Sequence, residues 1–176
     1  YGSGNMGATN AFRVMGPKFG TIIMVLDILK GMMAVGLFYF LPYYLTNELE
    51  RTNFMMGLGL SAVIGHIFPV FAQFRGGKGV ATLLGVVLAL QPMPCLFSIL
   101  VFLMVLLLGR MVSLASIIAG LSYPIILHFG FHNSNPALSL FSCAVAVLLV
   151  LTHRKNIKRI IRREEQKIQV FSFRNP

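Results

Sequence analysis

Long apolar segments separated by short polar ones make up most of the chain. A transmembrane helix needs about 20 predominantly apolar residues. One apolar segment is clearly shorter than the others; in chain order the six are residues 20–45, 54–72, 80–90, 95–108, 112–129 and 137–151. Pro124 lies in the fifth of them and predicts a kink. The pattern predicts an all-α, polytopic integral membrane helical bundle with about six transmembrane helices.

Composition agrees with this pattern. The 176 residues are 56% hydrophobic and only 11% charged, with a mean hydropathy of +0.78, whereas an ordinary soluble domain has about 25% charged residues. The net charge of +10 indicates that basic residues lie in cytoplasmic loops, where anionic lipid head groups are their partners. No stacking aromatic residues alternate with the charges of the basic C-terminal tail, so we expect no nucleic-acid partner.

The distribution of basic residues decides the orientation. If residues 1–16 lie in the cytoplasm and all six segments cross, 13 of the 15 Lys and Arg residues fall on the cytoplasmic side, with Arg51 outside and Lys30 within a helix. That distribution obeys the positive-inside rule. Leaving residues 80–90 out of the count would move Arg110 and the basic tail to the outer side. We therefore predict that residues 80–90 traverse, which puts three unusual polar blocks at one cytoplasmic face.

The first block, residues 1–16, is rich in glycine and small polar residues and contains one arginine. Glycines allow several N–H groups to turn toward one point, which suits an anion. Hydroxyl and amide side chains and a guanidinium can add to such a site; they are Ser3, Asn5, Thr9, Asn10 and Arg13. The alternative is an ordinary glycine-rich turn between helices.

The second block, residues 65–82, reads GHIFPVFAQFRGGKGVAT. Its GGKG resembles a nucleotide-binding P-loop, but that pattern needs Gly at position 72 and Ser or Thr at 79, where the chain has Ala72 and Gly79. Three glycines, Lys78 and the start of a helix at Val80 nevertheless predict an anion site. His66 is as consistent with a hydrogen-bonded packing role as with catalysis.

The third block, residues 152–165, places His153 and Asn156 three residues apart, on one face of a helix. The surrounding basic residues are typical of a juxtamembrane tail that contacts acidic lipid. Inside the first apolar segment, Asp27 and Lys30 are also three residues apart. Because ionisable groups are costly in a membrane, we predict that they form a structural ion pair supporting the first block.

Several chemistries are missing from the pattern. No cluster of His, Cys and carboxylate residues indicates a metal site, and we expect neither metal nor cofactor. With one Asp and four Glu in the chain, a carboxylate acting as general base is improbable. The predicted site binds anions and has few groups able to abstract a proton.

Three motifs, GSGNMGATN, GHIFPVFAQFRGGKGVAT and THRKNIKR, together with LDILKG and VSLASI, resemble the bacterial acyl-phosphate:glycerol-3-phosphate acyltransferase (PlsY) family over essentially the whole chain. The resemblance implies a single membrane-embedded domain over residues 1–176, with cytoplasmic blocks at residues 1–16, 65–82 and 152–165. Family members have seven helices, and the first of them and a D-x-R stretch precede GSGN. We therefore expect that an N-terminal helix is missing from this sequence.

The resemblance also implies a function. The family transfers an acyl group from acyl phosphate to the 1-hydroxyl of sn-glycerol 3-phosphate, which gives lysophosphatidic acid and phosphate in the first step of bacterial phospholipid synthesis. A substrate phosphate is thought to take the hydroxyl proton, and neither a metal nor coenzyme A is implied. The enzyme would be multi-pass in the bacterial inner membrane, with a cytoplasmic active site. We expect a monomer.

Site residues follow from motif positions. The resemblance assigns glycerol 3-phosphate binding and catalysis to Ser3, Arg13, Lys78, His153 and Asn156. It assigns the acyl-phosphate head group to a cradle of glycines and small polar residues, namely Gly4, Asn5, Gly7, Thr9, Asn10, Gly76, Gly77 and Gly79. Asp27, Lys30 and His66 would support the site. The chain departs from the family at Lys155, where an acid is common, and at Arg163, where a Gly is common.

Two alternatives from other functional classes remain. A transporter or flippase for a phosphorylated metabolite would place polar residues in mid-membrane on several spans, whereas here they gather at one face. A lipid-binding scaffold held by the basic tail would tolerate scrambling of GSGNMGATN.

Overall fold

The computed structural model describes residues 1–40 and 47–168. Those residues form eight α-helices and three short helical turns, and no strand. The helices are α1 Ala8–Val14, α2 Gly16–Gly36, α3 Glu48–Ile67, α4 Val80–Leu90, α5 Pro92–Gly109, α6 Val112–Ile125, α7 Pro136–Thr152 and α8 Arg154–Ile161. Two 3-10 turns, Leu37–Phe40 and Val70–Ala72, follow α2 and α3, and a π-helical turn, Ile126–Gly130, follows α6.

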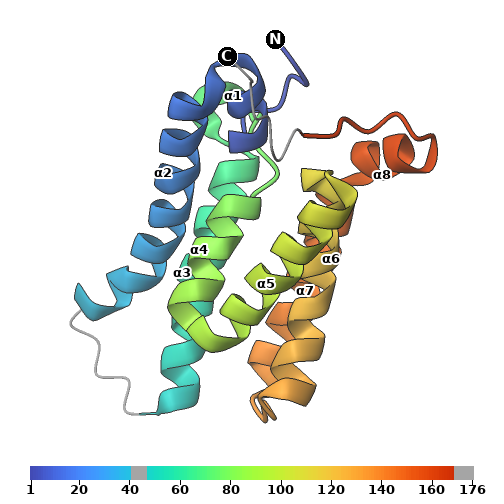
Figure 1. Cartoon of the computed structure of the whole chain (residues 1–176). Helices are drawn as coiled ribbons and strands as arrows, with labels where there is room; N and C mark the ends of the chain where they lie inside the picture. The colour runs from blue at the N-terminus through green and yellow to red at the C-terminus, as the bar shows by residue number, and fades with distance from the viewer. Residues whose placement is uncertain (41–46, 169–176) are drawn as a thin grey trace.

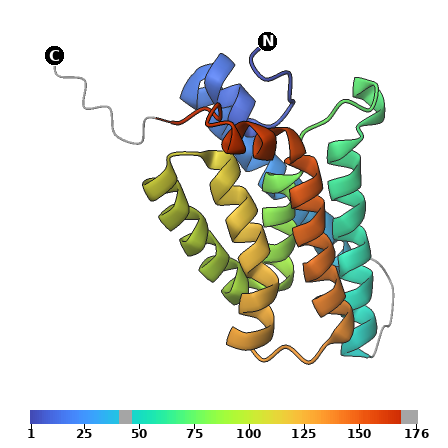
Figure 2. The same cartoon turned by 90° about the vertical axis from the view of Figure 1, so that its right-hand side faces the viewer.

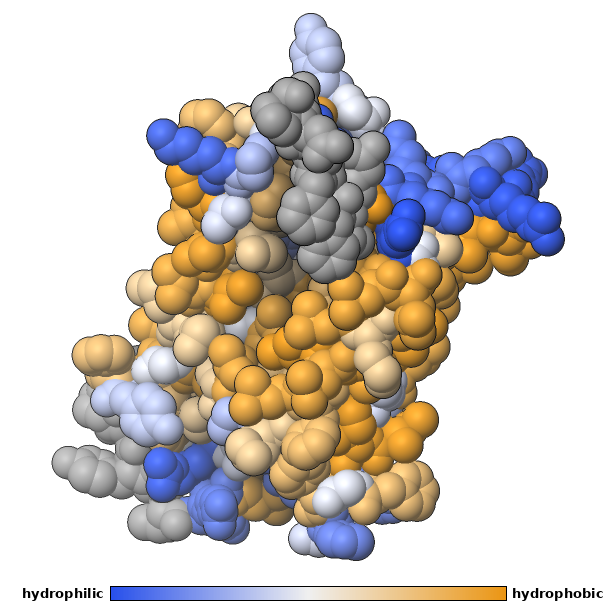
Figure 3. All heavy atoms as spheres, in the orientation of Figure 1, coloured by the Kyte–Doolittle hydropathy of each residue, from blue (hydrophilic) through white to orange (hydrophobic). Residues whose placement is uncertain are grey.

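The long helices pack side by side as one bundle (Figures 1 and 2). Within the described part of the chain, four helical segments are long and apolar enough to cross a membrane, and α7 becomes a fifth if it is taken together with α8, from which it is bent by 62°. Hydrophobic side chains cover the flank of the bundle in Figure 3, and hydrophilic ones gather toward its two ends. The predicted all-α integral membrane bundle is confirmed.

Helix boundaries differ from the predicted segments at the end of the bundle opposite α1 and α8. Asn47 accepts the N–H of Leu49 and so starts α3 before its predicted segment, and Asn135 accepts from the first turn of α7 in the same way. The predicted kink at Pro124 corresponds to the end of α6 and the π-helical turn that follows. The end of the first predicted segment, residues 41–45, lies outside the described residues.

Helix α4 lies in the middle of the bundle although it is the shortest of the apolar helices. Val86 is fully buried, and the backbones of α2 and α4 approach so closely that a Cβ on Gly31 or Gly85 would collide with a carbonyl of the other helix. Small residues at a helix contact allow such close packing within membranes. Eleven residues rise only about 16 Å, roughly half of the hydrocarbon thickness.

The chain nevertheless reverses direction between α4 and α5, as the predicted orientation requires. Both the start of α4 and the end of α5 lie at the end of the bundle where α1 and α8 are found (Figure 1). At this end the N–H of Ile168 donates to the carbonyl of Arg110, so the tail after α8 returns to the α5–α6 connection. The three polar blocks therefore meet at one end of the molecule, which we call the polar end.

Candidate active site

The first block folds into a turn held by one amide side chain. Asn10 Oδ1 accepts both the backbone N–H of Ser3, at 2.8 Å, and the hydroxyl of Ser3, at 3.1 Å. Gly2 and Gly4 have φ angles of 61° and 69°, a left-handed conformation that glycine adopts without steric cost. Asn10 thus fixes where the Ser3 side chain lies.

The remaining residues of the first block connect it to the second. Asn5 Oδ1 accepts the N–H of Gly7 at 2.9 Å, and Gly7 precedes the first turn of α1, in which Thr9 is partly buried. The two blocks approach each other there, since a Cβ placed on Gly7 would lie 4.0 Å from the Cα of Gly77.

The second block returns tightly onto the end of α3. Gly76 donates its N–H to the carbonyl of Ile67, and Gly77 donates to that of His66, each at 3.2 Å. Neither glycine has room for a side chain, because a Cβ would collide with the His66 carbonyl or with the His66 ring. Gly79, with φ of 79°, then starts α4. In this conformation the N–H groups of Gly76 and Gly77 donate to backbone carbonyls at the end of α3. Their contact with a phosphate stays a prediction.

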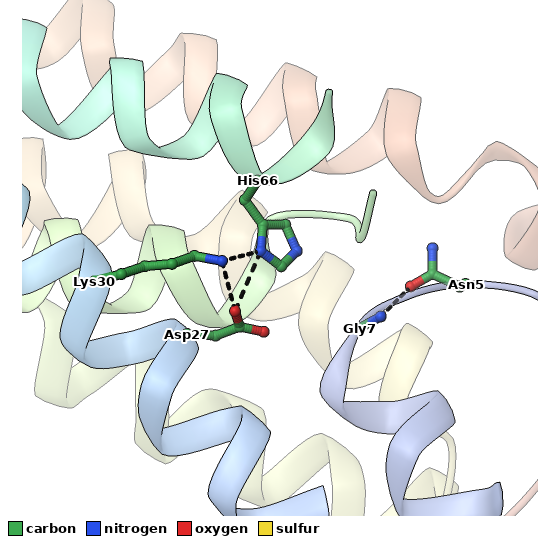
Figure 4. A network of polar contacts seen from close by, with 5 residues as sticks. All are labelled: Asn5, Gly7, Asp27, Lys30 and His66. Atoms are coloured by element: carbon green, nitrogen blue, oxygen red, sulfur yellow. Dashed lines mark hydrogen bonds and ion pairs between the residues drawn. The ribbon is translucent and has the colours of Figure 1, made fainter. Parts of the chain in front are cut away.

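Asp27, Lys30 and His66 form a cluster behind this loop (Figure 4). Lys30 Nζ lies 2.6 Å from Asp27 Oδ1, and His66 Nδ1 lies 3.3 Å from the same oxygen and also contacts Lys30 Nζ. The predicted ion pair is confirmed. His66 also contacts this pair and packs against Gly77, so the pair supports the second block directly, whereas its predicted support of the first block stays a prediction. His66 has the packing role that the sequence left open.

Lys78, His153 and Asn156 come together at the polar end. Lys78 Nζ donates to Asn156 Oδ1 at 2.6 Å, across 78 positions of sequence. His153 and Asn156 are 2% and 4% exposed. The Nδ1 of His153 lies 2.8 Å from the Leu149 carbonyl. A carbonyl only accepts, so Nδ1 carries a hydrogen and the Nε2 of a neutral ring is left as an acceptor.

Glu165 organises this cluster, and sequence reasoning missed it. Its Oε1 accepts from Asn156 Nδ2 and from Ser113 Oγ, and its Oε2 accepts from Arg159 Nε, all at 2.7 Å. Burial raises the pKa of this carboxyl, but the hydrogen bonds from Arg159, Ser113 and Asn156 outweigh burial and hold it below its usual value. Glu165 lay inside the third block, and the only signal for it was an acidic residue among many basic ones.

The charge state of Lys78 is set by its surroundings. The pKa of Lys78 is lowered to about 8, mainly by burial and to a smaller extent by the nearby charges of Arg159 and Arg13, while the negative charge of Glu165 opposes the shift. A second anion close to the ammonium would restore the ordinary preference for the charged form.

A pocket of about 390 Å³ lies between the first block and the tail that follows α8. It is lined by Ser3 and Arg13 from the first block and by Arg159 and Glu165 from the third, together with Gly2, Val14, Glu164 and Gln166. Lys78, His153 and Asn156 do not line it. Glu165 connects them to the pocket, because its Oε1 accepts from Asn156 and its Oε2 accepts from the pocket residue Arg159. Among the described residues, no cluster of His, Cys, Asp and Glu could hold a metal ion.

The chain was compared with families, curated proteins and solved structures. Residues 1–163 match the family described as glycerol-3-phosphate acyltransferase. The chain belongs to this family. Over 96% of its length it is 43% identical to glycerol-3-phosphate acyltransferase of Listeria monocytogenes and 38% identical to that of Chlorobium chlorochromatii, and it covers 81% and 83% of those proteins.

Two solved structures are also similar. Both are crystal structures of PlsY, an integral membrane glycerol 3-phosphate acyltransferase, in a glycerol 3-phosphate form and a lysophosphatidic acid form. The TM-scores are 0.84 and 0.81 at 38% identity, and the matches cover 96% and 95% of this chain and 80% and 81% of the others. The comparisons thus confirm the family that the three motifs predicted, and with it the acyltransferase class.

Proposed function

We propose that this protein transfers an acyl group from acyl phosphate to the 1-hydroxyl of sn-glycerol 3-phosphate, releasing lysophosphatidic acid and phosphate. The observation that carries the proposal is the meeting of the three blocks at one end of the bundle. Lys78 bonds Asn156 at 2.6 Å, and Glu165 bonds Asn156 while lining a pocket with Ser3 and Arg13.

Glycerol 3-phosphate is held by Ser3, Arg13, Lys78, His153 and Asn156. Arg13 offers a guanidinium that can bind phosphate with two parallel hydrogen bonds, and Lys78 supplies a point charge whose pKa is lowered to about 8, mainly by burial. His153 presents Nε2, with its ring fixed through Nδ1. These groups bind and orient the acceptor.

The acyl-phosphate head group lies against the contact between the first two blocks, near Asn5, Gly7, Thr9 and the glycines of GGKG, with its chain between lipid-facing helices. Rate then comes from positioning and from stabilising the charge that moves onto the leaving phosphate. Glu165 is not the base, because its two oxygens already accept three hydrogen bonds. A substrate phosphate takes the hydroxyl proton.

The whole chain acts as one domain, a monomer in the bacterial inner membrane, with the polar end in the cytoplasm. Support comes from the basic residues Arg13, Lys78 and Arg110 and those of α8, which share that end, whereas Glu48 and Glu50 start α3 at the other. A membrane-impermeant thiol reagent applied to intact cells should label His132→Cys at the outer end and not Lys155→Cys, both in a Cys143→Ser background. Labelling of Lys155→Cys instead would reverse the orientation.

The decisive experiment is a turnover assay with purified protein and glycerol 3-phosphate, in which acyl phosphate and acyl-CoA are compared as donors. We expect lysophosphatidic acid from acyl phosphate alone. Product from acyl-CoA only would contradict the donor. Accumulation of labelled glycerol 3-phosphate inside sealed proteoliposomes without acylation would instead support a transporter.

A further inference from the structure

Residues 68–75, FPVFAQFR, connect α3 to the GGKG sequence, and we call them the aromatic loop. Its large apolar side chains are turned outward: Phe68, Val70, Phe71 and Phe74 are 54%, 69%, 105% and 62% exposed. Figure 2 shows the loop above the upper end of α3, at the edge of the bundle and not folded over it. In water such a group of exposed aromatic side chains would be unfavourable.

Most backbone N–H groups of the aromatic loop and of the two glycines after it, by contrast, have partners within the chain. All six N–H groups from Ala72 to Gly77 donate to carbonyls of the segment 66–72, at 2.9 to 3.2 Å. Gln73 and Phe74 adopt left-handed φ angles of 52° and 60° to make this possible. A segment that lies in water does not need this closure, because water can bond its amides, whereas a segment in contact with lipid does.

The position of the loop agrees with a lipid partner. It continues directly from α3, whose Leu60 and Ile64 are exposed on the apolar flank of the bundle. It lies at the end where the basic residues gather, and its last residue, Arg75, is exposed. Apolar side chains such as Phe beside a cation suit the boundary between head groups and acyl chains, particularly of anionic lipids.

We propose that the aromatic loop is a membrane anchor whose partner is the head-group layer of the bilayer. Phe71 and its apolar neighbours insert at the boundary of the acyl chains, and Arg75 pairs with lipid phosphate.

The anchor is coupled to the site through the backbone. Gly76 and Gly77 bond the carbonyls of Ile67 and His66, at the point where the loop closes. Lys78 follows at once and bonds Asn156. Insertion of the loop therefore fixes the height of GGKG relative to the bilayer. An acylated donor would reach the site from that bilayer, and this link to the donor, unlike the insertion itself, rests on the proposed function.

Insertion is tested by fluorescence, because the chain contains no tryptophan. Phe71→Trp introduces a single reporter, and the variant is placed in vesicles that contain anionic lipid brominated either near the head group or near the end of the acyl chain. Leu100→Trp, an exposed position in the interior of α5, is the matched control for a deep location. Aqueous acrylamide is the quencher for a reporter in water.

We expect shallow bromines to quench Phe71→Trp several-fold more strongly than deep ones, with the order reversed for Leu100→Trp. Acrylamide should quench Phe71→Trp weakly. Strong acrylamide quenching without bromine quenching would place the loop in water and overturn the proposal. Failure of all three quenchers would show that another protein surface, such as a second copy, covers the loop, which overturns it equally.

The coupling to turnover has its own variants. Phe71→Asp should lose activity several-fold in anionic vesicles relative to Phe71→Leu, while the two variants have equal activity in detergent. Equal activity in vesicles would overturn the coupling. If the wild-type protein shows no acyl transfer at all, the proposed function fails, whereas the quenching data still decide whether the loop is inserted.

Discussion

Asn156 bonds Glu165 through its Nδ2, at 2.7 Å, and this contact leaves Asn156 Oδ1 directed to Lys78. An amide has one donating and one accepting end, so the carboxylate determines which end Lys78 meets. The Lys78 contact thus depends on a residue that does not touch Lys78 by a hydrogen bond.

Replacing Glu165 by Ala is expected to destabilise the protein by about 2 kcal/mol or more, because Asn156 Nδ2 and Ser113 Oγ lose their partner in a buried place. Turnover should fall as well, since Asn156 can then rotate. Glu164→Ala is the matched control, an exposed carboxylate one position earlier. Denaturant titration in detergent micelles measures the stability of the two variants, and an acyl-transfer assay measures their turnover. Equal stability of the two variants would contradict the network.

Lys78→Ala is expected to abolish turnover while the protein stays folded, because it removes the ammonium that bonds Asn156 and that, in the proposed function, binds the substrate phosphate. The KM for glycerol 3-phosphate should rise if residual activity is measurable. Lys158→Ala, an exposed lysine of α8, serves as the control for a general loss of positive charge. Wild-type rates in Lys78→Ala would rule out its assigned role.

Acyl transfer should also depend on pH through Lys78. Its pKa is lowered to about 8, mainly by burial, so the free enzyme is protonated below this pH and loses the charge above it. Since kcat/KM reports the groups of the free enzyme, kcat/KM for glycerol 3-phosphate should decline as pH rises through about 8. In Lys78→Arg, whose guanidinium stays charged, the decline should vanish whatever the absolute rate. An unchanged decline would assign it to another group.

Gly77→Ala is expected to impair both folding and turnover, because the new Cβ would collide with the His66 ring, which Asp27 and Lys30 hold in place. The loop that carries Lys78 would have to move. Gly57→Ala, in the interior of α3 with open space around it, is the control and should be neutral or slightly stabilising. The thermal midpoint and kcat of the two variants are compared with those of the wild type. If Gly77→Ala had the same values as Gly57→Ala, the loop would accommodate the added methyl group, and the predicted collision would be wrong.

Much of this protein could be predicted from the order of its residues. Apolar runs define membrane helices because the bilayer forces each backbone to satisfy its hydrogen bonds within the segment. The positions of Arg13, Lys78 and Arg110 predicted from the sequence that the three blocks share one end. The Asp27–Lys30 pair was predictable because positions three apart on a helix are neighbours.

Only the tertiary structure decided what connects the blocks. His66 joins Asp27 and Lys30 from another helix, and Glu165 bonds Ser113 from 52 positions away. Sequence spacing fixes neighbours along one helix, whereas contacts between helices depend on how the bundle packs, here on the close approach of Gly31 and Gly85. The sequence by itself determined which residues gather at the polar end; packing determined which atom of each faces which partner.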